Sequence, residues 1–217
     1  MSTRELHKGI DNLKNYVLEM GAHAQKMVEG GMQALQEMNL DLARNVDKKK
    51  HKLRECDDRI ENEAFKLIAL YSPMAIDLRR VTACLKINSY LYRIGRYGKV
   101  IAKIVKEIKN QPQVKLLVNI HHIFEHSNEM VSRALQAFHT EDTGLIYDFS
   151  ARDDEVDDLR WAIFRECITY MMENPKYITV CSHYIMIARY YERIGDNACK
   201  IAEKTNYMVT GEWKDFS

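Results

Sequence analysis

Proline and glycine are scarce in this chain, with 3 prolines and 9 glycines in 217 residues. Few positions therefore interrupt a helix, and long continuous helices can form. Apolar runs are also short, and none approaches the ~20 residues that span a bilayer. The first seven residues contain no apolar core of a signal peptide. These absences argue against a membrane-spanning or exported protein.

Patterned cysteines and net charge are lacking as well. Five cysteines are scattered without C-x-x-C spacing, as is typical of reduced, buried thiols in a cytoplasmic protein. The 32 Lys and Arg residues balance 31 Asp and Glu residues, which leaves a net charge of +1. This balance provides no general attraction to nucleic acid or to an anionic membrane, so we expect no nucleic-acid partner. A chain of this length can bury the cores of one or two compact domains.

The sequence Arg-Ile-Gly occurs twice, at 93–95 and at 193–195, and each copy lies within a row of isoleucines. The isoleucines recur every seven residues, which is the spacing of a buried seam on a helix. The two rows are Ile87, Ile94, Ile101 and Ile187, Ile194, Ile201. We infer an internal duplication, with one copy in residues 1–112 and the other in residues 113–217.

Helical periodicity extends through both halves, and sustained alternation of apolar and polar residues, the pattern of a strand, is missing. The polar, proline-containing segment 111–113 is the expected boundary between the halves. The predicted helices cover residues 8–38, 41–71 and 77–110, then 114–138, 143–173 and 176–208. The sequence therefore predicts an all-α fold of two tandem antiparallel three-helix bundles.

The second half contains two pairs of carboxylates, each with four-residue spacing. On a helix this spacing places both members of a pair on one face, one turn apart. The pairs are Asp153 with Asp157 and Glu192 with Asp196. Converging like charges need a cation or a base between them, and oxygen ligands suit Mg, Mn, Fe or Ca ions. Gly195 also predicts a close approach to the helix backbone. The alternative is that these acids only face water.

The first half has bases where the second half has these acids. Offsets of 103 and 100 residues match the four acidic positions to Lys50, Arg54, Tyr92 and Arg96. We expect no metal in the first half, because a cation is repelled by a site lined with bases. These bases are expected to pair with acids such as Glu55 or Asp58, or to be hydrated. The alternative is that they hold an anion, such as phosphate.

Two further patterns have a chemical and a structural interpretation. Residues 122–126 spell H-x-x-E-H, a zinc-peptidase pattern in which Glu125 would be the base. No third ligand or second lobe is evident, so a solvated helix face is the better interpretation. The basic run 48–52 would suit phosphates of nucleic acid or lipid, but acids follow it directly, which again favours a solvated face.

The segment around the second acidic pair resembles the signature of PhoU-type phosphate-signalling proteins. The resemblance is carried by Ala188-Arg189 before Glu192-Arg193-Ile194-Gly195-Asp196, by Asp77-Leu78-Arg79-Arg80 before Leu85-Lys86-Ile87, and by Thr169-Tyr170-Met171-Met172 before Asn174-Pro175. It covers essentially the whole chain in length, duplication and motif order. It implies two three-helix bundles related by pseudo-twofold symmetry, and motif pairs that bind iron or zinc clusters in some members.

The resemblance implies a cytoplasmic, non-enzymatic, homodimeric regulator of phosphate uptake. Such a protein would contact a phosphate ABC transporter and a sensor histidine kinase, and would meet the membrane only through these partners. Its second repeat would bind divalent or ferric metal (Fe, Zn, Mn or Mg) through Asp153, Asp157, Glu192 and Asp196. One alternative is a metal-dependent hydrolase that uses these carboxylates to activate water. Another is an accessory protein of a secondary phosphate transporter.

Overall fold

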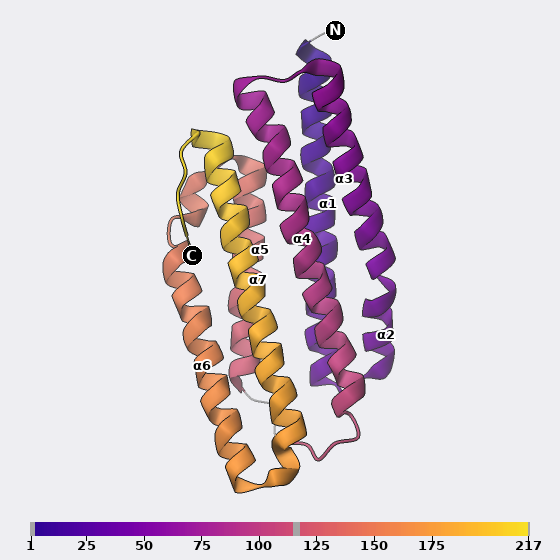
Figure 1. The fold of residues 1–217 in the computed structure, drawn as a ribbon, viewed down its shortest axis with the longest axis vertical. Helices are drawn as coiled ribbons and strands as arrows, with labels where there is room; N and C mark the ends of the chain where they lie inside the picture. The colour runs from indigo at the N-terminus through magenta and orange to yellow at the C-terminus, as the bar shows by residue number, and fades with distance from the viewer. Residues whose placement is uncertain (1–2, 115–117, 217) are drawn as a thin grey trace.

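The computed structural model describes residues 3–114 and 118–216, and the regular secondary structure in these ranges is entirely helical. Figure 1 shows two groups of long helices side by side, α1 to α4 in one and α5 to α7 in the other. Helices α2 and α3 follow one another along a single column (Figure 1), so α2 and α3 together occupy the place of one long helix in the first group. The predicted pair of tandem three-helix bundles is confirmed.

The first bundle consists of α1 (Thr3–Gln36), α2 (Leu40–Lys48), α3 (Lys50–Tyr71) and α4 (Ala75–Ile108). The sequence predicted one helix over 41–71, but the structure divides it at Lys49. The Lys49 N–H donates to the Val46 carbonyl at 3.1 Å, three residues back, and this tighter turn separates α2 from α3. At the start of α2, the Asn39 side chain accepts a hydrogen bond from the Asp41 N–H at 2.9 Å and caps the helix.

The second bundle consists of α5 (Val118–Thr140), α6 (Phe149–Glu173) and α7 (Ile178–Thr210). Two 3₁₀ turns, η1 (Thr143–Ile146) and η2 (Pro175–Tyr177), precede α6 and α7. The sequence had included these turns in its fifth and sixth predicted helices. The first residues of its fourth predicted helix lie partly outside the described residues. Asn174 caps the second turn, because its side chain accepts a hydrogen bond from the Lys176 N–H at 3.1 Å.

The two isoleucine rows lie at the centre of the molecule. All six side chains are fully buried, three on α4 and three on α7. These two helices pack against each other and run in opposite directions (Figure 1), so they join the two bundles. Burial of both rows explains the seven-residue spacing, because that spacing keeps one side of each helix facing the core.

Glycines allow the backbones of α1 and α4 to approach closely within the first bundle. A Cβ added at Gly98 would lie 2.6 Å from the carbonyl carbon of Met27, and one added at Gly31 would lie 2.7 Å from the carbonyl oxygen of Gly98. Real side chains do not reach these distances, so α1 and α4 can pack this way only without a Cβ at these positions.

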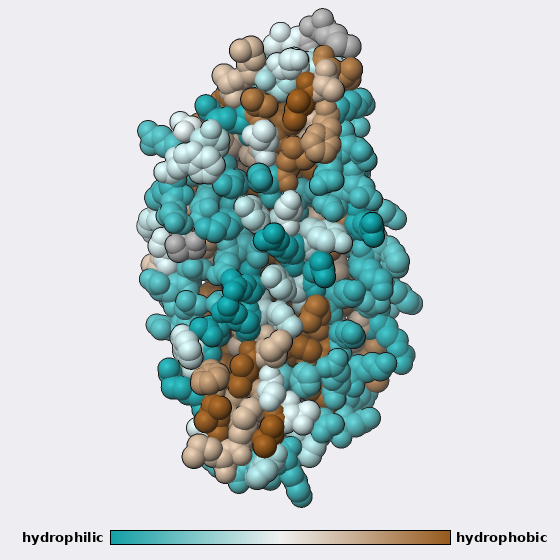
Figure 2. Space-filling model, viewed as in Figure 1, coloured by the Kyte–Doolittle hydropathy of each residue, from teal (hydrophilic) through white to brown (hydrophobic). Residues whose placement is uncertain are grey.

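Several apolar side chains are exposed near the connections between helices. Figure 2 shows apolar surface gathered toward both ends of the viewed face, with mostly polar surface between them. Exposed apolar residues near the α3–α4 and α6–α7 connections are Leu70, Met74, Ile76, Met172 and Ile178. Among the helices of the described ranges, none is long and apolar enough to cross a membrane.

Candidate functional site

The four predicted acids lie along the contact between α6 and α7. Asp153 and Asp157 come from α6, and Glu192 and Asp196 come from α7. The Arg160 Nε atom links the two helices, because it lies 3.9 Å from Asp157 Oδ1 and 3.7 Å from Glu192 Oε1. The structure therefore brings both predicted pairs to one seam of the second bundle.

Burial and mutual repulsion disfavour the charged forms of two of these carboxylates. The pKa of Asp153 is raised to about 6, first by burial and second by the carboxylate of Asp196. A hydrogen bond from the Cys199 thiol, 3.6 Å from Asp153 Oδ1, opposes this shift. The pKa of Glu192 is also raised, first by burial and then by Asp196, while neighbouring arginines lower it. Burial is therefore the main reason that these carboxyl groups resist ionisation, and repulsion between neighbouring acids adds to it.

Arginine side chains supply the positive charge that the acids need. Arg189 hydrogen-bonds Glu192 Oε1, and the Arg193 Nη1 atom donates to Asp196 Oδ2 at 2.8 Å. These arginines are absent from the site predicted from the sequence. The sequence spacing could have predicted these ion pairs, because Arg189 and Arg193 each precede a carboxylate by three residues on the same helix. Arg160 likewise follows Asp157 by three residues.

The donor chemistry of the site fits a hard cation, although its arrangement here is neutralised by arginine. Within the residues that the structure describes, no three His, Cys, Asp or Glu side chains converge as ligands of one metal ion. Glu192 Oε2 is nevertheless buried without a hydrogen-bond partner in the part of the chain that is described. Arg189 and Arg193 are 41% and 45% exposed, so both can turn into solvent and release carboxylate oxygens.

The close approach to the helix backbone that the sequence predicted at Gly195 is not found among the described residues. A Cβ at this position would lie 3.6 Å from Val156 Cγ1 and 3.7 Å from Asp153 Oδ1, which are ordinary contact distances. The protein itself therefore does not approach the Gly195 backbone unusually closely. One of these neighbours is the Asp153 carboxylate, so the Gly195 backbone lies directly beside a predicted ligand group.

The matching positions of the first bundle form a basic pocket of about 310 Å³, lined in part by Lys50, Arg54, Tyr92 and Arg96. The expected pairing with Glu55 or Asp58 is not found in the described part of the chain. Lys50 instead lies 2.8 Å from Asp47 Oδ2, because that carboxylate is one turn away on the same column of helices.

The H-x-x-E-H residues lie on α5 without the geometry of a peptidase site. His122 and Glu125 are exposed, and Glu125 pairs with His121 at 3.2 Å, while His126 pairs with Glu155 across to α6 at 3.2 Å. These contacts and exposures favour the solvated-face interpretation. In the basic run, Lys52 pairs with Glu19 at 3.5 Å, while Lys50 lines the basic pocket described above. All five cysteines are free and buried, as predicted.

Fold and site together define a class of duplicated helical-bundle proteins, with acids at a seam of one repeat and bases at the matching seam of the other. The model of the PhoU domain matches residues 17–105 and 120–205 of the chain, one match in each bundle. The chain belongs to the PhoU family. The predicted boundary near residue 112 falls between the two matches and stays a prediction.

Curated relatives resemble the chain over nearly its whole length. The phosphate-specific transport system accessory protein PhoU homolog of Caulobacter vibrioides is 37% identical over 90% of this chain and 86% of its own. The homolog of Aquifex aeolicus is 34% identical, over 96% of this chain and 94% of its own.

Solved structures agree with the fold. PhoU from Pseudomonas aeruginosa superposes with a TM-score of 0.90 at 29% identity, and covers 95% of this chain and 99% of its own. The phosphate transport system regulatory protein PhoU from Streptococcus pneumoniae gives a TM-score of 0.89 at 25% identity, over 97% and 99% of the two chains.

Proposed function

We propose that this chain is a cytoplasmic, non-enzymatic accessory protein that regulates phosphate uptake by contact with a phosphate transporter and its sensor kinase. The observation that carries the proposal is the family match in both repeats, together with relatives that are named as accessory or regulatory proteins of phosphate transport. The match covers 86–99% of the length of these relatives, which supports a shared role of the whole protein and not only a shared domain.

Action by contact is supported by an apolar stripe on the outer face of α6. The stripe consists of Trp161, Phe164, Ile168 and Met172, which are between 37% and 82% exposed. Their spacing of three or four residues places them on one side of the helix, while Val156, Ile163 and Cys167 face the core. Apolar helix faces left in water are a common feature of docking surfaces. Homodimer formation is part of the same proposal, with this stripe as one surface available for it.

Metal binding in the second repeat is the other part of the proposal. Asp153, Asp157, Glu192 and Asp196 would hold divalent or ferric ions, with Fe, Zn, Mn and Mg as candidates. A bound cation would neutralise the carboxylates and lower the pKa values that burial has raised. The partly exposed Arg189 and Arg193 would then release their acids.

The test is phosphate uptake in a strain from which the gene has been deleted. We expect uptake of radiolabelled phosphate to become constitutive in phosphate-rich medium, and the wild-type gene to restore repression. A Phe164→Glu and Ile168→Glu double variant should fail to restore it while keeping its helical circular dichroism spectrum. Phe65→Glu, at the position of α3 that matches Ile168, is the control.

The same strain separates the alternatives. Deleting the ABC transporter genes as well should abolish the excess uptake, whereas persistence of that uptake would favour a secondary transporter as the partner. Metal-dependent hydrolysis of a phosphoester by purified protein, abolished by Asp196→Asn, would establish the hydrolase instead.

A further inference from the structure

We propose that the first repeat contains a binding site for a phosphate-bearing anion, in the pocket where Arg54 and Arg96 meet Lys50. The inference rests on the contacts of the first bundle and is independent of the proposed function. At each of the four positions where the second repeat has a carboxylate, the first repeat has a side chain that can donate a hydrogen bond.

The pocket is concave and lies between α3 and α4, with α1 behind it. Its volume is about 310 Å³, and it adjoins a second pocket of about 320 Å³ that shares Arg96 and extends to Arg93. The first pocket is floored by Met27 and Leu53, which are buried apolar residues. Apolar walls raise the local electrostatic potential of the charges around them. The site is therefore a hollow rather than a flat basic surface.

Most of the positive charge at this pocket lacks a compensating acid. Within the described part of the chain, Arg54, Arg93 and Arg96 form no ion pair, and no carboxylate lines either pocket. Lys50 and Lys99 share one acid, Asp47, at 2.8 and 3.6 Å. The cations therefore outnumber the acids that neutralise them.

Asp57, one turn from Arg54, is turned toward another partner. The Nδ2 atom of Asn88, from α4, donates to Asp57 Oδ1 at 2.7 Å, and burial raises the Asp57 pKa. Arg54 lowers the Asp57 pKa only as a minor influence, and within the described part of the chain the two side chains form no ion pair.

The donor set selects the chemistry of the ligand. Lysine and arginine side chains donate hydrogen bonds and cannot accept them, and the Tyr92 hydroxyl can donate as well. A metal ion is excluded by these groups, whereas an oxyanion accepts hydrogen bonds from all of them. Guanidinium groups bind the oxygen pairs of phosphate in a bidentate manner, and two arginines with one lysine match a group that carries up to two negative charges.

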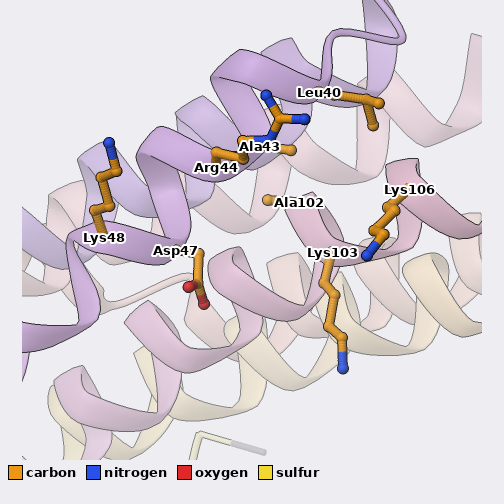
Figure 3. A pocket seen from close by; sticks show the side chains of 8 residues that line it. All are labelled: Leu40, Ala43, Arg44, Asp47, Lys48, Ala102, Lys103 and Lys106. Atoms are coloured by element: carbon orange, nitrogen blue, oxygen red, sulfur yellow. The ribbon is translucent and has the colours of Figure 1, made fainter.

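The surrounding surface would attract such an anion. Residues 1–112 hold 21 Lys and Arg against 14 Asp and Glu, whereas residues 113–217 hold 11 against 17. On α4 the basic stripe continues past Arg96 to Lys103 and Lys106, which border a further pocket with α2 (Figure 3). In that view Asp47 projects from α2 toward α4. Although the whole chain is nearly neutral, its first repeat therefore carries an excess of basic residues.

Calorimetric titration of the full chain with inorganic phosphate at low ionic strength tests the site. We expect saturable binding of one phosphate, weakened at least tenfold in an Arg54→Ala and Arg96→Ala double variant. Replacing both arginines by lysine should retain part of the affinity, because charge is kept while bidentate geometry is lost. Arg165→Ala, an exposed arginine of α6 in the second repeat, should bind phosphate as the wild type does.

Parallel titrations identify the source of the phosphate group. Tighter binding of AMP than of inorganic phosphate would assign the site to a phosphate ester, and the reverse order would assign it to free phosphate. Absence of saturable binding for both, or equal binding by the Arg54→Ala and Arg96→Ala variant, would overturn the proposal. Circular dichroism of each variant shows whether the fold is intact, and the uptake phenotype of the deletion strain is unaffected by either result.

Discussion

Glu192 illustrates how single side chains at the acidic seam are balanced. This residue is only 7% exposed, and a buried charge is costly unless a partner neutralises it. Arg189 and Arg160 contact one oxygen, while the other lies 3.8 Å from Arg193 Nε and has no hydrogen-bond partner among the residues described. Guanidinium groups and a bound cation are two solutions to the same electrostatic problem. Glu192 Oε2, which lacks a hydrogen-bond partner among the residues described, is a position at which a bound cation would add an interaction.

Removing two of the carboxylates should abolish metal binding. We expect the wild-type chain to retain metal after purification and Glu192→Gln with Asp196→Asn to lose it, because neutral amides attract a cation far less than carboxylates do. Plasma mass spectrometry of the purified proteins measures the metal content. Glu55→Gln with Asp58→Asn is the control in the first repeat and should retain it. Metal that survives in the first double variant would show that the duplicated motif has been misinterpreted.

Asp153 should make the metal-free protein less stable as the pH rises. Its pKa is about 6 when folded, above the ordinary 3.8, so the folded state binds more protons between these values. The free energy of unfolding contributed by this group is therefore fully present below about pH 4 and is lost as the pH rises through about 6. Asp153→Asn should remove this loss and stabilise the protein at pH 7 by on the order of 2 kcal/mol, after allowance for solvent screening.

Urea unfolding in the presence of a chelator measures this effect. Wild type and Asp153→Asn should have similar stability at pH 4 and should differ at pH 7. Asp158→Asn, an exposed neighbour on α6, should show no such divergence. A variant that is no more stable than wild type at pH 7 would refute the assignment.

At the scale of elements, two helix glycines serve different purposes. A Cβ at Gly98 would lie 2.6 Å from the Met27 backbone, whereas a Cβ at Gly195 would meet atoms at ordinary contact distances. Backbone atoms of packed helices cannot move aside individually, so Gly98→Ala should destabilise the fold by roughly 1–3 kcal/mol or more. Gly195→Ala should be neutral, or stabilising by up to about 1 kcal/mol in metal-free protein, because alanine favours helix more than glycine does.

Thermal unfolding of the two variants side by side tests this difference. The melting temperature should fall for Gly98→Ala and should hold or rise for Gly195→Ala. Equal losses in both variants would mean that glycine serves backbone packing at both positions. A metal-binding defect in Gly195→Ala without loss of stability would show that the added methyl group disturbs the neighbouring Asp153 carboxylate.

For the whole molecule, the contact between α4 and α7 should make the two repeats unfold together. Ile94 is fully buried, and Ile94→Ala should cost roughly 2–5 kcal/mol through the cavity it leaves. Both tryptophans, Trp161 and Trp213, lie in the second repeat. If the shared core couples the bundles, a substitution in the first repeat will shift the fluorescence transition of the second.

Urea titrations followed by fluorescence and by circular dichroism measure this coupling. Their midpoints should coincide in wild type and fall together in Ile94→Ala. Ile194→Ala, the matching change on α7, should produce a comparable shift. A fluorescence transition that stays in place in Ile94→Ala would show that the bundles unfold independently.

The sequence by itself determined the helical class, the duplication and the family. Seven-residue rows such as Ile87, Ile94 and Ile101 place one side of a helix in the core whatever its neighbours are, so local periodicity was sufficient. The offsets between copies also placed Asp153 with Asp157 on one helix and their basic counterparts on another. These features depend on spacing within a helix or between copies, and both can be counted along the chain.

Only the tertiary structure decided what surrounds each side chain. Arg160 joins acids of α6 and α7, and Asp57 turns to Asn88 rather than to its neighbouring arginine. It also distinguished Gly98, which packs against another backbone, from Gly195, which does not. Partners from different helices are set by how those helices approach and rotate, and burial then decides which charges must be paired. Spacing along one helix does not contain that information.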